Sequence, residues 1–583
     1  VGAVVARSTA QQRCAPPESR WAGVWDSNRR ADLRQAFART GKPFARAASD
    51  AVDRALDRYR ADWLSMRQAA CLATLDGAQP RDVLDLRTEC LDRRLEYARA
   101  LLAQLAVADG AAVQNAARAV EDLQPLSDCA DEQALRAGAA WPLDPSRRAE
   151  VEEVRAQVAN ARALLALGSI ESALEAATST AARARATGYQ PLVADAELLL
   201  ARIHGQFYSR PEAVAAAHRA AAAAQETGQL DLAVQAWTQL VRHTAAEGGD
   251  WSMWSIYAEA LLRRLSGDTR VLRARLLRSQ ATAEAHARRY PRALALARQA
   301  LALAEQAHGG DSEEVSVTLG NIATSAWYLG DLDIALAAHE QGAEIDLRVV
   351  GPDHPHYAEH LSQMAGILVE AGRWEEALRR ADEAESVFRK VLTAGNSRLL
   401  ALAQHRAIAL AHLEVERGTS LGAESLVRTE LRALEQRAGA DEEWTVSLRT
   451  ALGQVLRLHG RCAEALPIFQ RSRDALARHA VVAEEQWDLA EARRMLGACL
   501  LATGKPDRAL PELRQSVKWF EENGTRNFLR AEGQYLLAQA QWQTGAREDA
   551  RSGAAAAKEL LAAIGPRGQR LLPEVDRWIA EHR

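Results

Sequence analysis

A Gly-x4-Ala motif returns in one register through residues 168–550, and this repeat limits the possible folds more than any other feature of the sequence. Its copies begin at Gly168, Gly330, Gly372, Gly418, Gly460, Gly504 and Gly545. The same register adds anchor residues at Ala213, Trp254 and Ala293, so that ten anchors follow one another at spacings of 39 to 46 residues. Such a period predicts an array of repeated units that stack on their neighbours.

Two columns of small residues support the same register. Seven residues after the anchors, eight of the ten positions are small, and twelve residues before them nine of the ten are small. Small residues at fixed helical offsets allow two antiparallel helices to approach closely. The Gly between the columns is expected to end the first helix in the left-handed conformation that Gly tolerates. Each unit is therefore predicted to be a helical hairpin that buries its apolar stripes only by stacking.

The composition agrees with stacked helices and excludes some functions. Ala and Leu dominate, 48% of the residues are hydrophobic and only 5% are aromatic. The 73 Lys+Arg and 77 Asp+Glu leave a formal net charge of −4. This balance argues against nucleic-acid binding by phosphate neutralisation, and it gives no reason to expect adhesion to anionic lipid. We therefore expect an all-α chain with no nucleic-acid partner.

The residues before the repeats predict a separate helical module at 14–136. Apolar residues recur at steps of three and four between Val52 and Met66 and between Leu84 and Leu105, which indicates two amphipathic helices around the turn at residues 76–80. Residues 137–148 are predicted to be a linker. No uncharged apolar stretch is long enough to span a bilayer, although Val1 to Ala6 is a short apolar run. We interpret residues 1–13 as the possible end of a membrane helix and a linker.

The inter-helix Gly, the two small columns and the Ala-Leu pairs beginning at Ala335, Ala377, Ala465 and Ala509 resemble the tetratricopeptide repeat. The segment from Gly351 to Pro355, which leads into Gly372, is similar to the longer repeats of kinesin light chain and many bacterial signalling proteins. HEAT and armadillo repeats share the period, but they do not require that Gly together with both small columns.

This resemblance implies an all-α, right-handed superhelical solenoid of about ten hairpins. The array would occupy residues 149–565, and residues 566–583 would form a C-terminal capping helix. The second to fourth and the seventh hairpins fit the columns worst, so we expect local irregularity there.

Disulfides are predicted in the N-terminal module, because it holds an even number of cysteines in a small part of the chain. These are Cys14, Cys71, Cys90 and Cys129. Of the three possible pairings we favour Cys71 with Cys90, which lie on opposite sides of the predicted turn, and Cys14 with Cys129. Four buried thiols in a reducing cytoplasm are the alternative. Cys462 and Cys499 lie on repeat helices and are interpreted as core residues.

The same region suggests a parent protein. Cys14, Trp25, the tracts Trp63–Cys71 and Leu84–Leu91, and Cys129 ahead of tetratricopeptide repeats resemble the region after the membrane helix in large myxobacterial serine/threonine protein kinases. That resemblance implies an extracytoplasmic, regulatory region of a membrane-anchored bacterial protein. The Gly-rich loop, H-R-D and D-F-G motifs of a kinase are absent from the sequence, so this chain is predicted not to be an enzyme.

No cofactor or metal site is predicted. No C-x2-C pair or zinc-binding helix motif occurs. The nearest candidate, Asp353 with His354, His356 and His360, has ligand types at a common spacing and is not retained as a metal site. The tryptophans of the repeats are interpreted as core residues; they are Trp237, Trp251, Trp254, Trp327 and Trp374.

The first helices of tetratricopeptide hairpins line a concave groove, and a polar residue just ahead of the small column often binds an extended peptide. Here that position holds Asn321 and Gln363 in consecutive hairpins, whose amides can donate to and accept from a peptide backbone. In the other hairpins the position is mostly apolar.

The resulting hypothesis is a protein-interaction or sensor scaffold that binds a protein or peptide partner in the groove, with a homodimer possible. The alternative is a cytoplasmic repeat module of a transcription regulator that senses a small-molecule inducer.

Overall fold

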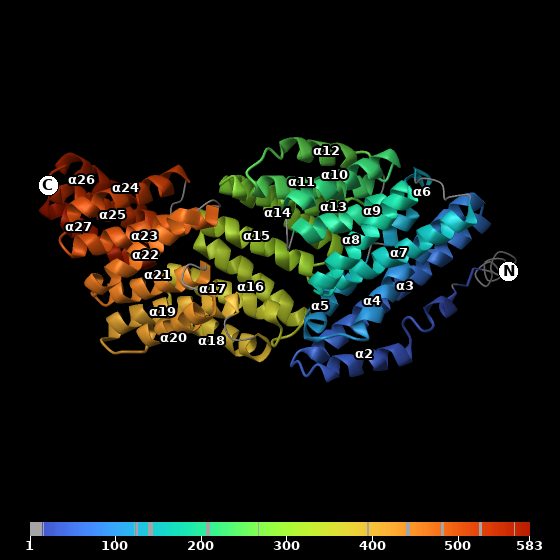
Figure 1. Cartoon of the computed structure of the whole chain (residues 1–583), viewed down its shortest axis with the longest axis horizontal. Coiled ribbons are helices and arrows are strands. Elements are labelled where there is room, and N and C mark those ends of the chain that lie inside the picture. Colours follow the sequence, from blue (N-terminus) through green and yellow to red (C-terminus); the bar gives the residue numbers. More distant parts are fainter. Residues whose placement is uncertain are drawn as a thin grey trace, which may run out of the picture. The chain divides into compact units, whose positions relative to one another are not determined.

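The computed structural model describes residues 14–582 apart from residues 16, 122, 124–125, 138–143, 206–209, 266–267, 393–395, 439–442, 480–482, 524–527 and 565. All regular elements in these ranges are helices, which confirms the predicted all-α class (Figure 1). The chain divides into two compact units, one of residues 1–318 and 345–354 and the other of residues 319–344 and 355–583. None of the described helices is long and apolar enough to cross a membrane.

The described N-terminal residues are helical. Their elements are η1 (Glu18–Trp21), α2 (Ser27–Arg39), α3 (Ala45–Leu75), α4 (Arg81–Leu105), α5 (Gly110–Glu121), η2 (Leu126–Ala130) and α6 (Glu132–Ala137). Helices α3 and α4 are the two predicted amphipathic helices, and the predicted turn separates them. The possible end of a membrane helix at residues 1–13 lies outside the described residues, as do residues 138–143 of the predicted linker.

Ten helical hairpins follow, as predicted. Their first helices are α7 (Pro145–Ala166), α9 (Gln190–Ile203), α11 (Leu230–Ala246), α13 (Arg270–His286), α15 (Glu313–Leu329), α17 (Pro355–Glu370), α19 (Ser397–Arg417), α21 (Glu443–Leu458), α23 (Ala483–Ala502) and α25 (Phe528–Gln543). Their second helices are α8 (Ile170–Thr187), α10 (Arg210–Glu226), α12 (Ser252–Leu262), α14 (Tyr290–His308), α16 (Leu332–Val349), α18 (Trp374–Val391), α20 (Ala423–Ala438), α22 (Cys462–His479), α24 (Pro506–Glu522) and α26 (Arg547–Ala562). Helix α27 (Pro566–Glu581) comes last.

The anchors of the sequence repeat lie in the second helices. Nine of the ten are alanines with at most 1% of their surface exposed. All seven glycines of the motif have positive φ, from 66° to 94°, so each ends a first helix in the expected left-handed conformation. In the fourth hairpin Arg288 takes this place with a φ of 60°. For a residue other than Gly this conformation costs about 1–2 kcal/mol.

Glycines in the small columns allow bulky side chains of the facing helix to come close. A Cβ atom at Gly453 of α21 would lie 2.7 Å from the ring of Phe469 of α22. A Cβ atom at Gly497 of α23 would lie 2.5 Å from Leu513 of α24. Real Cβ atoms do not approach neighbours this closely. The helices of these two hairpins can therefore pack at this distance only because Gly has no side chain.

The anchor predicted at Trp254 is wrong by one residue. Trp254 is only half-buried, whereas Ser255 is buried and takes the fourth position of α12, as the anchors do in most second helices. Twelve residues before Ser255 lies His243, only 2% exposed, in the column where a small residue is expected. Its ring fits because a Cβ atom at Gly205, in the preceding hairpin, would lie only 2.0 Å away. The irregularity expected in the third hairpin is therefore present.

A buried carboxylate organises the connection between the two helices of the seventh hairpin. Glu414 of α19 accepts hydrogen bonds from the backbone N–H groups of Leu421, Gly422 and Ala423, at 2.5, 2.7 and 3.2 Å. These groups lie at the start of α20, where the first N–H groups of a helix need acceptors. Burial raises the pKa of Glu414, but these hydrogen bonds outweigh it, and the pKa lies below its ordinary value. Glu414 thus caps the next helix across the connecting loop.

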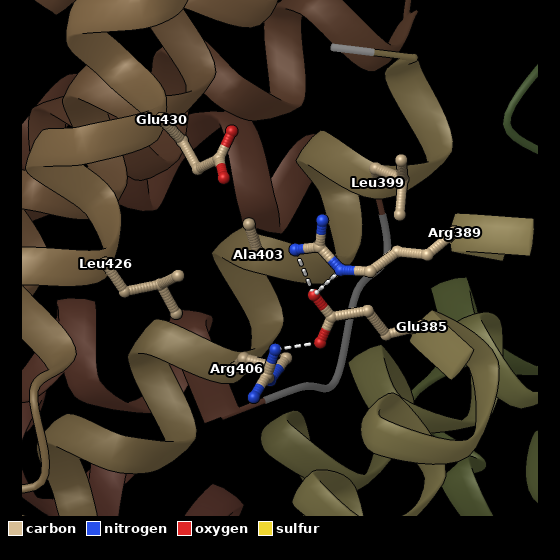
Figure 2. Close-up of a pocket in the computed structure, with 7 residues that line it drawn as sticks. All are labelled: Glu385, Arg389, Leu399, Ala403, Arg406, Leu426 and Glu430. Carbon is tan, nitrogen blue, oxygen red and sulfur yellow. Dashed lines mark hydrogen bonds and ion pairs between the residues drawn. The ribbon is translucent and has the colours of Figure 1, made fainter. Parts of the chain in front are cut away.

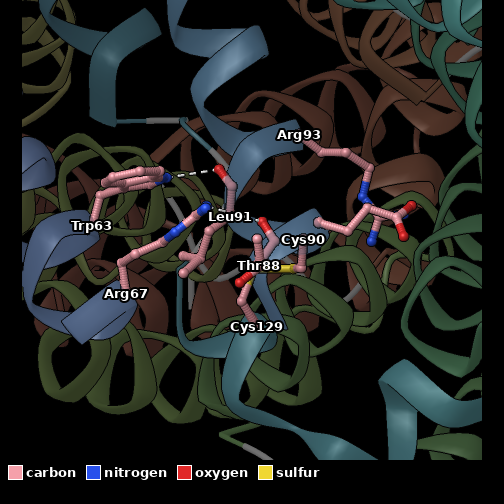
Figure 3. The surroundings of a disulfide bond; sticks show 8 residues. Trp63, Arg67, Thr88, Cys90, Leu91, Arg93 and Cys129 are labelled. Atoms are coloured by element: carbon pink, nitrogen blue, oxygen red, sulfur yellow. Dashed lines mark hydrogen bonds and ion pairs between the residues drawn. A yellow bond between two sulfur atoms is a disulfide. The ribbon is translucent and has the colours of Figure 1, made fainter. Parts of the chain in front are cut away.

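The N-terminal helices pack around Trp63 of α3. The indole N–H of Trp63 donates to the carbonyl oxygen of Leu91 in α4 at 2.7 Å, as Figure 3 shows. The rings of Trp21 and Trp63 meet edge to face with centroids 6.0 Å apart. Because α3 and α4 are antiparallel, the Trp63–Leu91 bond shows which residues of the two helices lie at the same level.

A loop far along the chain docks on these helices. The His354 ring bonds through Nε2 to the carbonyl oxygen of Gln114 at 2.8 Å and meets Phe44 edge to face at 5.2 Å. Val350 packs against Ala51 and Ala117. Val350 and His354, at the Gly-Pro-Asp-His-Pro segment identified by its resemblance to long repeats, therefore pack on the N-terminal helices within the first unit.

The favoured cysteine pairing is wrong. The structure joins Cys14 to Cys71, and Cys90 to Cys129, with Cα atoms 5.6 and 5.5 Å apart (Figure 3). Cys71 lies four residues before the end of α3, and Cys90 lies nine residues after the start of α4. At about 1.5 Å per residue their levels differ by about 7 Å along the helix axes, which is too far for a disulfide.

The core interpretation of the last two cysteines is incomplete, because Cys462 of α22 and Cys499 of α23 are also paired. Their Cα atoms lie 4.9 Å apart, and both residues are buried. This bond connects the eighth hairpin to the ninth.

A matched pair of glycine substitutions tests the close approach within hairpins. We expect Gly453→Ala to lower the free energy of unfolding by about 1–3 kcal/mol, because the added methyl group overpacks the Phe469 contact. Gly553→Ala is the control, since its nearest neighbour would lie at an ordinary 3.5 Å. In a helix interior that change should raise stability by up to about 1 kcal/mol. Equal effects of the two variants in denaturant titrations would contradict the packing argument.

Thiol counting tests the three disulfides. The protein, denatured and treated with iodoacetamide without reduction, should gain no mass, whereas reduction in denaturant before alkylation should label all six cysteines. Cys462→Ser should release one thiol, Cys499, without affecting the other two pairs. Labelling of four thiols before reduction would show that the N-terminal disulfides do not form.

Candidate partner-binding surface

The first helices form the inner face of each compact unit. Consecutive first helices contact one another, from α7 to α13 in the first unit and from α17 to α25 in the second. Consecutive second helices make no comparable contact among the described residues. Because the first helices lie closer together, each unit curves toward them. Their exposed side chains therefore line its concave side.

Polar side chains connect neighbouring first helices. The pairs are Arg162–Asp195 and Arg202–Gln235 in the first unit, and Gln404–Ser447, Gln454–Glu491 and Arg494–Glu532 in the second. Arg494 is fully buried, so its positive charge must be stabilised by its ion pairs with Glu491 and Glu532. Apolar periodicity does not reveal these pairs. A signal was nevertheless present, since Arg162, Arg202 and Gln454 each directly follow a residue of the small column.

The two predicted partner-binding residues lie on consecutive first helices of the second unit. Gln363 of α17 is exposed, and its amide contacts Glu359 one turn earlier at 3.2 Å. Asn321 of α15 is half-buried, and its side-chain amide has no hydrogen-bond partner among the described residues. No described hydrogen bond joins the two amides. Both groups therefore keep hydrogen-bonding capacity that a ligand could use.

The same column is closed in most other hairpins. Leu199, Leu240, Ala409 and Met495 take this position there, and each is at most 2% exposed. These residues pack between helices and face no groove. Ser279 of α13 is also polar and half-buried at this position, so among the described residues Asn321 and Gln363 are the two accessible amides of the column.

An aromatic cluster crosses the second unit. The ring of Trp487, at the start of α23, lies 5.1 Å from Trp327 and 5.5 Å from Tyr328, both at the end of α15. It also meets Trp519 and Phe520 of α24 edge to face, at 5.7 and 5.3 Å. Trp487 is 5% exposed. The fifth hairpin is therefore in contact with the ninth.

A second contact spans the same number of hairpins. Arg570 of α27 pairs with Glu416 of α19, and its guanidinium lies 5.5 Å from the centre of the Trp374 ring. The Trp374 indole also donates to Glu416 at 3.1 Å and stacks on His412 at 3.9 Å. Together with the Trp487 cluster, this contact holds the second unit in a closed turn.

The core interpretation of the repeat tryptophans is right for two of the five residues. Trp237 and Trp374 are 9% and 1% exposed. Trp251, Trp254 and Trp327 are only half-buried. The indole N–H of Trp327 donates to the buried Glu370 of the next first helix at 2.5 Å, so this half-buried ring also has a polar partner.

A polar depression lies between α18, α19 and α20, and Figure 2 shows its lining. Glu385 is held between Arg389, at 2.7 Å, and Arg406. Glu430 takes the column position at which most hairpins have a small residue, and it has no ion-pair partner among the described residues. The larger side chain accounts for the local irregularity of the seventh hairpin. Most charges of the depression are already paired, so it is a poor site for a small ligand.

The histidines near the long loop do not gather into a metal site. His354 turns to Gln114, whereas His360 meets His339 of α16 with Nδ1 atoms 3.0 Å apart. Among the described residues no group of three or more His, Cys, Asp or Glu side chains could hold a metal ion. Burial lowers the pKa of His360 to about 4, and burial together with the charge of His360 lowers the pKa of His339 to about 3. Both rings are therefore neutral at physiological pH, and one donates a hydrogen bond to the other.

Comparison with known proteins gives a family match in part of the chain. The tetratricopeptide repeat family matches residues 272–348 and 318–390, which belong to the fourth to sixth hairpins. A kinesin light chain of Podosopora anserina with nearly identical TPR-like repeats shares 16% identity over 36% of this chain and 98% of its own, with a TM-score of 0.32. No curated protein matches the chain.

Two further solved structures are similar over longer stretches. A Rap protein complexed with competence and sporulation factor shares 14% identity over 61% of this chain and 99% of its own, with a TM-score of 0.39. BtubC (BKLC) of P. vanneervenii shares 18% identity over 40% of this chain and 91% of its own, with a TM-score of 0.30.

The buried histidine pair makes stability depend on pH. The pKa values of both rings lie below the unfolded value of about 6.5, so protonation favours the unfolded chain. The contribution of this pair to stability should be constant above about pH 7 and fall below about pH 6.5, by up to about 1.4 kcal/mol per pH unit for each ring. His360→Gln should flatten the dependence of the unfolding midpoint between about pH 7 and pH 5. His286→Gln, an exposed position on α13, should leave the slope unchanged. Other buried groups such as Asp346 and His405 titrate in the wild type and in His360→Gln alike, so equal slopes of these two proteins would contradict the argument.

Proposed function

We propose that this chain is a non-catalytic scaffold that binds an extended segment of a partner protein on the inner face of its second unit. The observation that carries this proposal is the accessible amide of Gln363, next to a hairpin in which the Asn321 amide has no partner among the described residues. A peptide backbone presents alternating N–H and C=O groups, and an amide side chain can satisfy both kinds.

Preorganisation supports the same proposal. The Trp487 cluster and the Arg570 contact hold the second unit in one curvature, so the surface exists before a partner arrives. A rigid surface loses little conformational entropy on binding, and more of the interaction energy appears as affinity.

We further propose that the chain is the regulatory tetratricopeptide region of a bacterial membrane serine/threonine protein kinase and lies outside the cytoplasm. The pairing of all six cysteines supports this location, because disulfides persist in oxidising compartments and are rare in the cytosol. The resemblance of the tracts around Cys71 and Cys90 to such kinases supports the parentage. The membrane would be reached only through a segment that precedes this chain.

For the alternative function, a cytoplasmic regulator that senses a small inducer, the depression beside Glu385 offers no support. Small-molecule sites are concave and mostly apolar. The depression beside Glu385 is lined by four charged residues, and Glu385, Arg389 and Arg406 are already joined.

Peptide selection followed by substitution tests the binding surface. Peptides of about 12 residues would be selected from a random display library on the full chain, and their affinities measured by calorimetry. The double variant Asn321→Ala, Gln363→Ala should weaken binding about tenfold or more, because each lost hydrogen bond contributes about 1 kcal/mol.

Gln341→Ala is the matched control, since Gln341 is an exposed amide on the second helix of the fifth hairpin. The affinity of this variant for the selected peptides should stay within about twofold of the wild-type affinity. If selected peptides bind the double variant as tightly as the wild type, the binding surface lies elsewhere.

A further inference from the structure

Helix α12 exposes an apolar side to solvent. Met253, Ile256 and Tyr257 are 52%, 60% and 43% exposed. A single exposed apolar residue is ordinary on a protein surface, but these three are neighbours at helical spacings of three and four. They form one continuous apolar stripe, named here the α12 face.

The α12 face is rigidly supported. The opposite side of the helix is buried through Ser255, Ala258 and Leu262. Trp254 stacks on Trp237 with an interplanar angle of 7° and centroids 5.4 Å apart, and Tyr257 meets Trp237 at the same distance. The exposed groups are thus held in place by a packed aromatic base.

Opposite charges flank the α12 face. Met253, Tyr257 and Ala260 follow one another along one side of α12 at steps of four and three residues. Asp250 lies two residues before the helix, where its carboxylate accepts hydrogen bonds from the N–H and hydroxyl groups of Ser252 at 2.9 and 2.6 Å, and Arg264 lies two residues after the helix. Asp250 and Arg264 are both exposed, and each lies seven residues from Tyr257. Arg264 has no ion-pair partner among the described residues, and neither does its neighbour Arg263.

We propose that the α12 face joins two copies of this chain, with the two α12 helices antiparallel and a two-fold axis at Tyr257. In this arrangement Asp250 of each copy lies opposite Arg264 of the other, and the apolar stripes cover each other. A parallel arrangement would bring like charges together at both ends. The pattern is therefore complementary to itself in one orientation only, as a two-fold interface requires.

The size of the α12 face predicts a weak dimer. Stable interfaces bury about 800 Å² on each partner, and an exposed stripe of a three-turn helix supplies only part of this area. A dissociation constant on the order of micromolar is expected. The formal net charge of −4 opposes association only slightly.

Sedimentation of the full chain tests the dimer. The wild type should sediment as a dimer at about 100 µM, and Tyr257→Asp should weaken association at least about tenfold. Val107→Asp is the control, because Val107 is 77% exposed in the N-terminal part and should not affect association. Circular dichroism should show equal helix content in all variants. A monomeric wild type, or a Tyr257→Asp variant that associates like the wild type, would overturn the proposal.

Charge reversal tests the orientation. Arg264→Asp alone should weaken the dimer, because it places two carboxylates opposite each other. Adding Asp250→Arg in the same chain should restore association. If Arg264→Asp had weakened the dimer only by damaging the structure of the chain, this second substitution would not restore it. Failure of this rescue would overturn the antiparallel arrangement.

A cysteine on the two-fold axis gives an independent readout. All six native cysteines are paired, so Tyr257→Cys should introduce the one free thiol of the chain and form a cross-linked dimer on mild oxidation. Val107→Cys should not cross-link at the same rate. Equal cross-linking of the two variants would contradict the axis position.

Discussion

The close contact between the two helices of each hairpin is the interaction on which the rest of the structure depends. Anchor alanines are buried in the second helices, and Gly453 and Gly497 leave no room for a methyl group. Only when a hairpin closes this tightly do the polar residues of successive first helices come within hydrogen-bond distance. Curvature, inner face and exposed amides all follow from that helix separation.

The sequence predicted the hairpins well because their signals are local. Helix pairs, the left-handed Gly and nine anchors could be read from spacing alone. The third hairpin shows where spacing fails, since His243 replaces a small residue only because Gly205 of another hairpin leaves space. The cysteine pairing failed for a similar reason. It depends on the levels of α3 and α4, which the Trp63–Leu91 hydrogen bond reveals and the turn position does not.

The candidate site was predictable in part. The residues Asn321 and Gln363 follow from their column, but their accessibility does not, because the same column is buried at Leu240 and Met495. The contact of Trp487 with Trp327 joins residues 160 positions apart, and no periodic pattern indicates it. Long-range contacts of this kind depend on the accumulated rotation of several hairpins, to which each loop contributes.

That contact also changes how the second unit loses its structure. In a solenoid whose repeats touch only their neighbours, stability is a sum of adjacent terms, and terminal repeats fray independently of the middle. The Trp487 cluster adds a stabilising contact between the fifth and ninth hairpins, which are not neighbours. Fraying of the ninth hairpin therefore removes burial from the fifth as well, so these five hairpins behave as one cooperative block and resist stepwise unzipping from the C-terminal end.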